Sequence, residues 1–279
     1  MSENPTDVTS GADYGTDADA GADVNADPDA EDGPADSHGD PVLRTRSVAR
    51  EFGDALVLDG VDLTLGRGSV VGLVGPNGSG KTTLLRVLAG LLAPTRGTVE
   101  RAVDAERPVG YLPQSPSFRE RFTVSETLRF YADLTSATVD VRASLERVGM
   151  ADVADRRVEA LSGGMVRLLG VAQATVGDPP LLVLDEPTSG LDPEMAARIF
   201  SVVADLGATG TTVVLATHDL GGVDAVADAV VLLNEGTVEA IGPPTTLQER
   251  TGTDSLRAAF SALIERADVG VQGGRGRDA

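Results

Sequence analysis

The sequence predicts an α/β domain with a mostly parallel β-sheet. Apolar runs of buried-strand length alternate with segments of helical character from residue 41 onward. Such alternation is typical of strand–helix–strand units, whose parallel strands are buried on both faces. With 279 residues, of which 41% are hydrophobic, the chain is long enough to bury a sizeable core in one large or two small domains.

Each expected element rests on a short local pattern. The predicted buried strands are continuous apolar runs, and they span Val70–Val74, Leu181–Leu184 and Thr212–Ala216. The predicted helices lie at Lys81–Leu91, Val124–Leu134 and Val139–Val148 and in a segment that begins near Gly163. Two further runs predict a hairpin, Ala229–Leu233 and Thr237–Ile241, joined through Asn234-Glu235-Gly236. An apolar stripe predicts a last helix and consists of Leu256, Phe260, Leu263 and Ile264.

Negative charge is concentrated at the start of the chain. The 43 acidic and 23 basic side chains give a net charge of −20, and residues 1–40 hold twelve of the acids and no Lys or Arg. This stretch repeats Ala, Asp, Gly and Pro without hydrophobic periodicity, so it cannot bury enough surface to order itself. We interpret 1–40 as a disordered, solvating acidic tail, with an interaction tail as the alternative.

Composition excludes several kinds of chemistry. Without cysteine the chain has no disulfide, no catalytic thiol and no Cys-based metal site, and its two histidines exclude a multi-histidine zinc site. No apolar run approaches the roughly 20 residues that span a bilayer, so we expect any membrane role to come from a partner. Lys81 is the one lysine among 23 basic residues and aromatic residues make up 3%, a composition that resembles salt-adapted (halophilic) proteins.

The strongest motif follows the first buried strand. The segment Gly75-Pro76-Asn77-Gly78-Ser79-Gly80-Lys81-Thr82, followed by Thr83, matches the GxxxxGK[ST] pattern between a strand and a helix. Its glycines let backbone N–H groups surround phosphates, Lys81 reaches the β- and γ-phosphates, and the Thr82 hydroxyl binds Mg²⁺. An ordinary glycine-rich turn is the alternative. We expect this phosphate loop (Gly75–Thr82) to bind a nucleoside triphosphate.

Polar residues follow the two later strands. Asp185 and Glu186 come directly after 181–184, and His218 follows 212–216. Because the carboxyl ends of parallel strands meet at one sheet edge, we expect these side chains beside the phosphate loop. Asp185 is predicted to hold Mg²⁺ and Glu186 to polarise the attacking water, and His218 is predicted to contact the γ-phosphate and orient that water. Solvated carboxylates and a structural histidine are the alternatives.

These residues together resemble the ATP-binding cassette (ABC) ATPases. The decisive match is the signature segment, Leu161-Ser162-Gly163-Gly164-Met165, which lies between the phosphate loop and Asp185. The resemblance covers about residues 41–250 and implies an ABC ATPase domain with a P-loop NTPase core, an antiparallel β subdomain and a helical signature subdomain at about 115–176. Residues 251–279 are then expected to form a C-terminal helix and a flexible tail.

The resemblance also implies further site residues. Gln114 in Tyr111-Leu112-Pro113-Gln114 resembles the Q-loop glutamine, which touches Mg²⁺, and Asp192 in Ser189-Gly190-Leu191-Asp192 resembles the D-loop aspartate. Phe52 stands where a tyrosine commonly stacks on adenine, and Met165 replaces a glutamine. Ser162 and Asp192 also fit as plain helix N-caps, and Phe52 taken alone fits a core residue.

The resemblance implies an ATP-hydrolysing subunit that uses ATP and Mg²⁺. Two cassettes, here a homodimer, would pair head to tail, with each ATP between Lys81 of one subunit and Ser162–Gly164 of the other. An integral-membrane permease would hold the protein at the cytoplasmic face of the membrane and respond through the segment between Gln114 and Leu161. No nucleic-acid partner is expected, because the surface is acidic.

Two other functions compete with the transporter ATPase. A soluble ABC ATPase that acts on DNA or ribosomes usually carries a long coiled-coil insertion or two cassettes, and this chain has neither. An unrelated P-loop NTPase would lack the signature segment. Three segments resemble ATPases of the drug, sodium and copper-site-maturation export group, and they are Thr123–Leu134, Val166–Val176 and Pro179–Pro193. The cargo is not encoded in these residues, because the permease selects it.

Overall fold

The computed structural model describes residues 41–101 and 105–274, and side chains through 266. The strands are β1 (Pro41–Phe52), β2 (Ala55–Gly66), β3 (Val70–Val74), β4 (Arg96–Arg101), β5 (Val109–Leu112), β6 (Leu181–Asp185), β7 (Thr212–Ala216), β8 (Ala229–Asn234) and β9 (Thr237–Gly242). The α-helices are α1 (Lys81–Leu88), α2 (Val124–Leu134), α3 (Val141–Arg147), α4 (Gly163–Ala174), α5 (Pro193–Ala208), α6 (Leu220–Val226), α7 (Pro244–Thr251) and α8 (Leu256–Gly274). The predicted acidic tail, 1–40, lies outside these residues.

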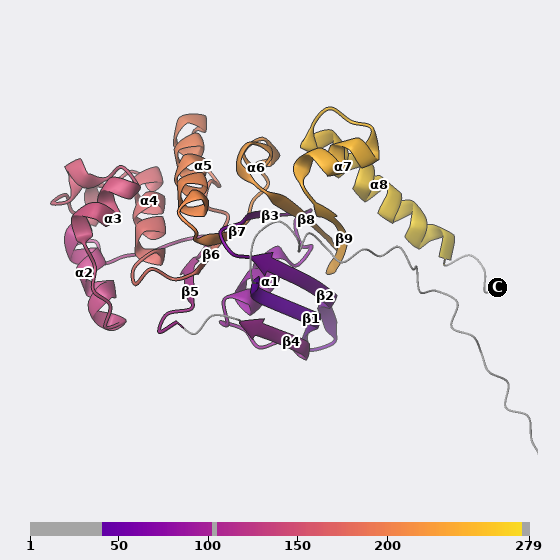
Figure 1. The fold of residues 1–279 in the computed structure, drawn as a ribbon, viewed down its shortest axis with the longest axis horizontal. Helices are drawn as coiled ribbons and strands as arrows, with labels where there is room; N and C mark the ends of the chain where they lie inside the picture. Colours follow the sequence, from indigo (N-terminus) through magenta and orange to yellow (C-terminus); the bar gives the residue numbers. More distant parts are fainter. Residues whose placement is uncertain (1–40, 102–104, 275–279) are drawn as a thin grey trace, which may run out of the picture. The chain divides into compact units, whose positions relative to one another are not determined.

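The strands form two sheets (Figure 1). The larger has the order β5-β6-β7-β3-β8-β9, in which the first five strands are parallel and β9 pairs with β8 in antiparallel fashion. The smaller, β2-β1-β4, is antiparallel. The predicted α/β class with a mostly parallel sheet, a second antiparallel sheet and separate helices is confirmed.

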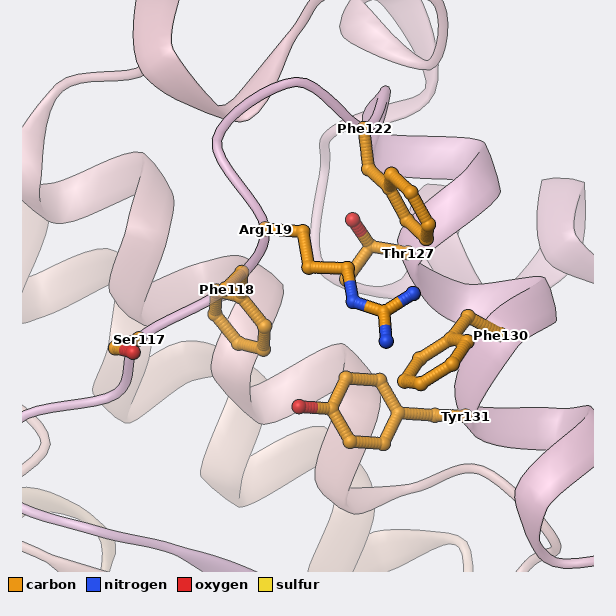
Figure 2. Close-up of a pocket in the computed structure, with 7 residues that line it drawn as sticks. All are labelled: Ser117, Phe118, Arg119, Phe122, Thr127, Phe130 and Tyr131. Carbon is orange, nitrogen blue, oxygen red and sulfur yellow. The ribbon is translucent and has the colours of Figure 1, made fainter.

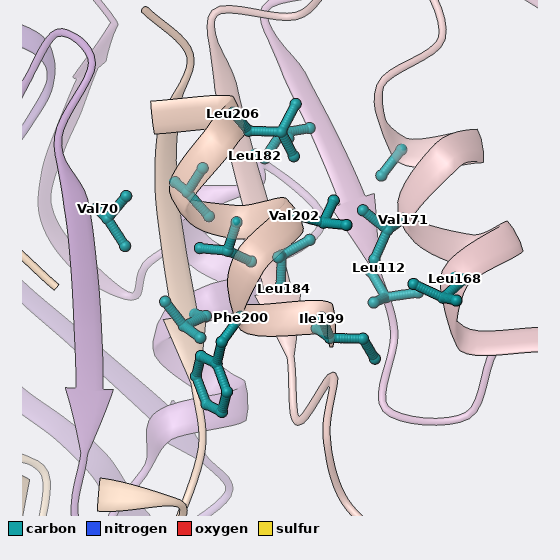
Figure 3. Close-up of a cluster of buried hydrophobic side chains, with 14 of the residues drawn as sticks. Val70, Leu112, Leu168, Val171, Leu182, Leu184, Ile199, Phe200, Val202 and Leu206 are labelled. Atoms are coloured by element: carbon teal, nitrogen blue, oxygen red, sulfur yellow. The ribbon is translucent and has the colours of Figure 1, made fainter. Parts of the chain in front are cut away.

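Both faces of the larger sheet are buried, which explains the uninterrupted apolar strands. Alternate residues point to opposite faces. In β6, Leu182 and Leu184 pack toward α4 and α5, as Figure 3 shows, whereas Leu181 and Val183 join the core around α1. Helix α1 therefore lies between the two sheets, where it contacts β2 as well as β6 and β7.

Close packing of helices on the sheet depends on small residues. A Cβ at Gly72 of β3 would lie 2.5 Å from Val223 of α6, and one at Gly207 of α5 would lie 2.6 Å from Val70. Such distances are shorter than van der Waals contact, so a larger residue would push the helix off the sheet. This packing fixes the positions of the loops at the sheet edge.

The helical segment between β5 and β6 contains α2, α3 and α4. Helix α2 begins at a capping box, because Thr123 accepts from the Glu126 backbone N–H and Glu126 accepts from that of Thr123. Helix α4 is capped by Ser162, and it packs against α2 and α3 and against β5 of the sheet. The loop from β5 to α2 therefore connects the sheet edge directly with this helical layer.

Three predicted helix bounds are wrong, and one of them by a single residue, because α3 ends at Arg147 rather than Val148. Helix α1 ends at Leu88 rather than Leu91, because Gly90 adopts φ 74° and reverses the chain, which leaves Leu91 exposed. Helix α3 begins at Val141 rather than Val139, because the Asp140 carboxylate accepts from the Ala143 N–H and caps the helix. The expected hairpin is present as β8 and β9.

Candidate functional site

Four neighbouring strands end beside one another at the carboxyl edge of the larger sheet. Gln114 follows β5, Glu186 follows β6, His218 follows β7, and the phosphate loop follows β3. The strand order β5-β6-β7-β3 therefore gathers segments that are far apart in sequence. A cavity of about 370 Å³ opens there and is lined by Val57, Asn77, Gly78, Gly80, Lys81, Thr82, Thr83, Gln114 and Glu186.

The phosphate loop needs glycine at specific positions. Gly78 and Gly80 have φ values of 85° and 102°, in the left-handed region. A Cβ at Gly75 would lie 2.0 Å from the Leu233 carbonyl oxygen, and one at Gly80 would lie 2.8 Å from that of Val57. The loop is thus pressed against β8 and β2, and its other side borders the cavity.

Lys81 is folded back over the phosphate loop. Its Nζ donates to the carbonyl oxygens of Gly75 and Pro76, each at 2.8 Å. Burial lowers the pKa of Lys81, and the nearby carboxylates of Glu186 and Asp185 partly oppose this effect. Ser79 Oγ is also buried and has no hydrogen-bond partner among the described residues. An ammonium and a free hydroxyl beside a glycine cradle fit the negative charge and acceptor oxygens of a phosphate.

Asp185 is the last residue of β6 and is 1% exposed. Its Oδ1 accepts from Thr82 Oγ1 at 3.1 Å, and its Oδ2 lies 3.5 Å from the Tyr111 hydroxyl. Burial raises the pKa of Asp185, although hydrogen bonds from Thr82 and Tyr111 act in the opposite direction. Thr82 lines the cavity together with Gln114, and Asp185 lies directly behind the Thr82 hydroxyl. These three side chains supply oxygen donors of the kind that fits Mg²⁺.

Glu186 has a strained backbone and a free carboxylate oxygen. Its φ is 50°, and its N–H donates to the Ala216 carbonyl at 2.9 Å, which ties the end of β6 to β7. Oε2 is buried and accepts no hydrogen bond among the described residues, although His218 Nδ1 lies 3.0 Å from it. The His218 ring is itself exposed. The pair thus presents an unused carboxylate acceptor beside an imidazole that faces solvent.

Gln114 lies on the exposed loop that follows β5. Its backbone carbonyl accepts a hydrogen bond from Arg167 of α4. Gly170 of α4 lies so close to β5 that a Cβ there would be 2.5 Å from Leu112. The segment from β5 to Gln114 is therefore joined to α4 by both a hydrogen bond and direct packing.

Residues of the signature segment and Asp192 do not line the cavity. Ser162 Oγ accepts from the Met165 N–H at 3.3 Å, and Asp192 Oδ1 accepts from the Met195 N–H at 2.9 Å, so both predicted N-caps are confirmed. Gly163 is exposed, with no atom within 4 Å of a Cβ built there. Gly164 is buried against Met195. Within one chain, the sequence-predicted site is thus divided into two groups.

Phe52 lies at the tip of the β1–β2 hairpin and is 48% exposed, which excludes the core alternative. On the adjoining strand, Val57 of β2 lines the cavity at the phosphate loop. Phe52 and the cavity-lining Val57 therefore lie at the same end of the smaller sheet. One of its faces is covered by the guanidinium of Arg50, 4.5 Å from the ring centroid.

An aromatic pocket that was not predicted from the sequence lies beyond Gln114. The pocket has a volume of about 230 Å³ and is lined by Ser117, Phe118, Arg119, Phe122, Thr127, Phe130 and Tyr131 (Figure 2). The Arg119 guanidinium lies over the rings of Phe122 and Phe130, at 5.0 and 4.2 Å. A signal was available in the sequence, because four of the nine Phe and Tyr residues fall within 118–131.

A phosphate loop, an Asp-Glu pair and a histidine along one edge of a parallel sheet define a nucleoside triphosphatase of the P-loop class. Comparison with known proteins narrows this class. The family described as ABC transporter matches residues 58–189. The Nod factor export ATP-binding protein I of Cupriavidus pinatubonensis is 36% identical over 252 residues, covering 82% of this chain and 78% of that protein.

Further relatives and solved structures that resemble this chain are also components of transport systems. The fluoroquinolones export ATP-binding protein of Mycobacterium tuberculosis is 35% identical over 249 residues, covering 84% of this chain and 83% of that protein. A solved ATP-binding subunit of an ABC transporter has a TM-score of 0.70 at 27% identity, covering 80% of this chain and 99% of that one. A subunit of the cbiONQ complex from Clostridium perfringens has a TM-score of 0.68 at 27% identity, covering 76% and 92%.

The chain belongs to the ABC transporter family, and it is an ATP-binding subunit with ATPase activity. The alternative of an ABC ATPase that acts on nucleic acid or ribosomes is not favoured, since the relatives are ATP-binding proteins of export systems.

Proposed function

We propose that this ATPase powers export through a separate integral-membrane permease, which holds it at the cytoplasmic face of the membrane. The support is the named export function of the relatives that match over most of the chain. In the part of the chain that the structure describes, no helix is long and apolar enough to cross a membrane. On this proposal, the permease contributes the pathway and this chain contributes ATP hydrolysis.

Nucleotide binding follows from the cavity at the sheet edge. Backbone N–H groups of the phosphate loop and of the start of α1 bind the phosphates, and Lys81 moves its Nζ from its own carbonyls to the β- and γ-phosphates. Phe52 stacks on adenine. Thr82, Asp185 and Gln114 hold Mg²⁺, which neutralises charge on the phosphate oxygens when bound.

Glu186 is the general base for ATP hydrolysis in this proposal, because one of its carboxylate oxygens has no hydrogen-bond partner among the described residues. Glu186 Oε2 accepts a proton from the attacking water, and its lack of another hydrogen bond among the described residues is the observation that carries this role. His218, 3.0 Å from that oxygen, holds the carboxylate and donates to the γ-phosphate.

A second copy of the chain completes the site. Ser162 and Gly163 are exposed at the start of α4 yet line no part of the nucleotide cavity of their own chain. In a head-to-tail homodimer, Ser162–Gly164 and Asp192 of one subunit meet the γ-phosphate held by Lys81 of the other. ATP then closes the pair, and its hydrolysis reopens the pair.

The permease contacts the helical segment between Gln114 and Leu161. The pocket around Arg119 begins three residues beyond Gln114, and it combines aromatic rings with one guanidinium in a chain whose net charge is −20. Aromatic and arginine side chains are the residue types that most often anchor protein interfaces. The loop at Gln114 is joined to α4, so closure over ATP is transmitted to this surface.

Co-purification tests the proposed partner. The full chain is expressed with the permease encoded beside it, and the tagged permease is captured from detergent-solubilised membranes. We expect the ATPase in the eluate, and we expect Arg119→Ala to reduce its amount while Arg257→Ala, an exposed control on α8 outside this segment, leaves it unchanged. Full recovery of Arg119→Ala would contradict the assigned surface, and absence of the wild-type chain from the eluate would contradict the partnership.

A further inference from the structure

We propose that Arg50 is a positioning residue for nucleotide binding, which holds Phe52 as a one-sided platform for adenine. The inference rests on the proposed function, in which Phe52 stacks on the base. Phe52 is half exposed at the tip of a hairpin, so its ring needs a contact that keeps it ordered. Phe52 pairs with Ala55 at the closed end of β1 and β2, where little surrounds the ring.

Arg50 is itself fixed in position. It lies two residues before Phe52 on β1, so both side chains are on the same face of the strand. Its Nη1 donates to the Ala93 carbonyl at 3.0 Å, which anchors the guanidinium to the loop after α1. The same stretch of β1 is tied to the same loop by backbone bonds, because Thr95 N–H donates to the Ala49 carbonyl at 2.8 Å and Glu51 N–H donates to Thr95 Oγ1 at 3.1 Å.

Hydrogen bonding alone does not explain where this guanidinium lies. Arg50 Nε is buried and has no hydrogen-bond partner among the described residues, which is an energetic cost. The same placement puts the guanidinium carbon 4.5 Å from the centroid of the Phe52 ring. Stacking on the ring is the favourable contact that this placement makes. Arg50 is therefore positioned for Phe52 at the expense of one of its own donors.

Two consequences for the nucleotide follow. The face of Phe52 that Arg50 covers is closed to the base, so adenine stacks on the opposite face. Phenylalanine also lacks the hydroxyl through which a tyrosine could be held by a hydrogen bond, and the guanidinium supplies the missing restraint. An ordered ring loses less conformational entropy when adenine binds, so the effect appears in affinity for the base and not for the phosphates.

The test compares ATP with a ligand that has no base. Binding of Mg-ATP and of Mg-tripolyphosphate is measured by calorimetry in the full chain, with Glu186→Gln present throughout to stop hydrolysis. In Arg50→Met, which keeps the unbranched stem, we expect ATP affinity to fall about 2- to 5-fold, the range of an exposed cation–π contact, while tripolyphosphate affinity is unchanged. Arg96→Met is the matched control, because Arg96 pairs with Glu51 on the same sheet, and it should change neither.

Each other outcome is decisive. Equal losses for ATP and tripolyphosphate would overturn the inference, because Arg50 would then act through the phosphate loop or the fold. Unchanged ATP binding in Arg50→Met, alongside weaker ATP binding in Phe52→Leu, would also overturn it. Unchanged ATP binding in Phe52→Leu would instead contradict the proposed adenine contact itself. If Arg50→Met does not fold, Arg50→Gln, which retains a donor for the Ala93 carbonyl, gives the same comparison.

Discussion

Replacing Glu186 with glutamine removes one proton acceptor and almost no volume. Oε2 is buried and accepts no hydrogen bond in the described part of the chain, and the one polar group close to it is His218 Nδ1, at 3.0 Å. The amide therefore opens no cavity and changes only the contact with His218. General-base catalysis contributes about 10²- to 10⁴-fold, so we expect kcat to fall by that factor, a barrier increase of about 3–5 kcal/mol. ATP affinity should be equal or higher, because a negative charge near the γ-phosphate is removed.

The assay is phosphate release at saturating Mg-ATP, together with direct measurement of ATP binding. Glu235→Gln is a suitable control, since Glu235 is also a glutamate with positive φ, at 45°, but is exposed in the turn between β8 and β9. Lys81→Ala should lose both binding and hydrolysis, which separates the phosphate contact from the catalytic step. Hydrolysis by Glu186→Gln within threefold of wild type would refute the assignment of Glu186 as the base.

Three further predictions address stability and coupling. Burial raises the pKa of Asp185, so its charged form costs folding free energy at neutral pH. Asp185→Asn should therefore raise the Tm of the nucleotide-free protein, by about 2–4 °C for each 1 kcal/mol gained in the free energy of unfolding, and should abolish Mg²⁺-dependent hydrolysis. A lower Tm would contradict this reasoning. We propose that the net charge of −20 makes the stability of the fold depend on salt, so the Tm should rise between dilute and molar KCl. A Tm independent of salt argues against salt adaptation. Deletion of residues 1–40 should leave ATPase activity unchanged. Phe130→Ala should leave the ATPase activity of the isolated chain unchanged and reduce its stimulation by the permease, measured in proteoliposomes; equal stimulation of both proteins would be evidence against this contact.

The sequence predicted best those helices and strands whose bounds are set by a few neighbouring residues. The bounds of β3, β7 and α2 match the sequence prediction. Continuous apolar runs mark the two strands, and the structure adds a capping box at the start of α2. The strands of the smaller sheet were not located individually. Its register shifts several times between β1 and β2, and β1 also pairs with β4, which lies beyond α1 in the sequence. Irregular pairing of this kind leaves no clear two-residue period.

In the candidate site too, features set by short sequence patterns were predicted, and features set by the packing of separate segments were not. Motif residues were found because their chemistry depends on short spacing, as in the phosphate loop and Asp185-Glu186. The contact between Tyr111 and Asp185, and the pocket that Arg119 forms with Phe118 and Phe130, depend on how separate segments pack. Those contacts arise from the parallel strand order and the helical layer, which no local pattern specifies.

Mixing two inactive variants tests the central claim, that one active site is built from two subunits. Ser162→Arg blocks the face that we assign to the partner's nucleotide, and Lys81→Ala removes the phosphate contact. A heterodimer of the two contains one complete site, formed by Lys81 of the first chain and Ser162 of the second. Random exchange in an equal mixture gives half heterodimers, so about a quarter of the wild-type activity should return. Activity no greater than the sum of the separate variants, in a mixture shown by affinity capture to contain heterodimers, would contradict the shared site.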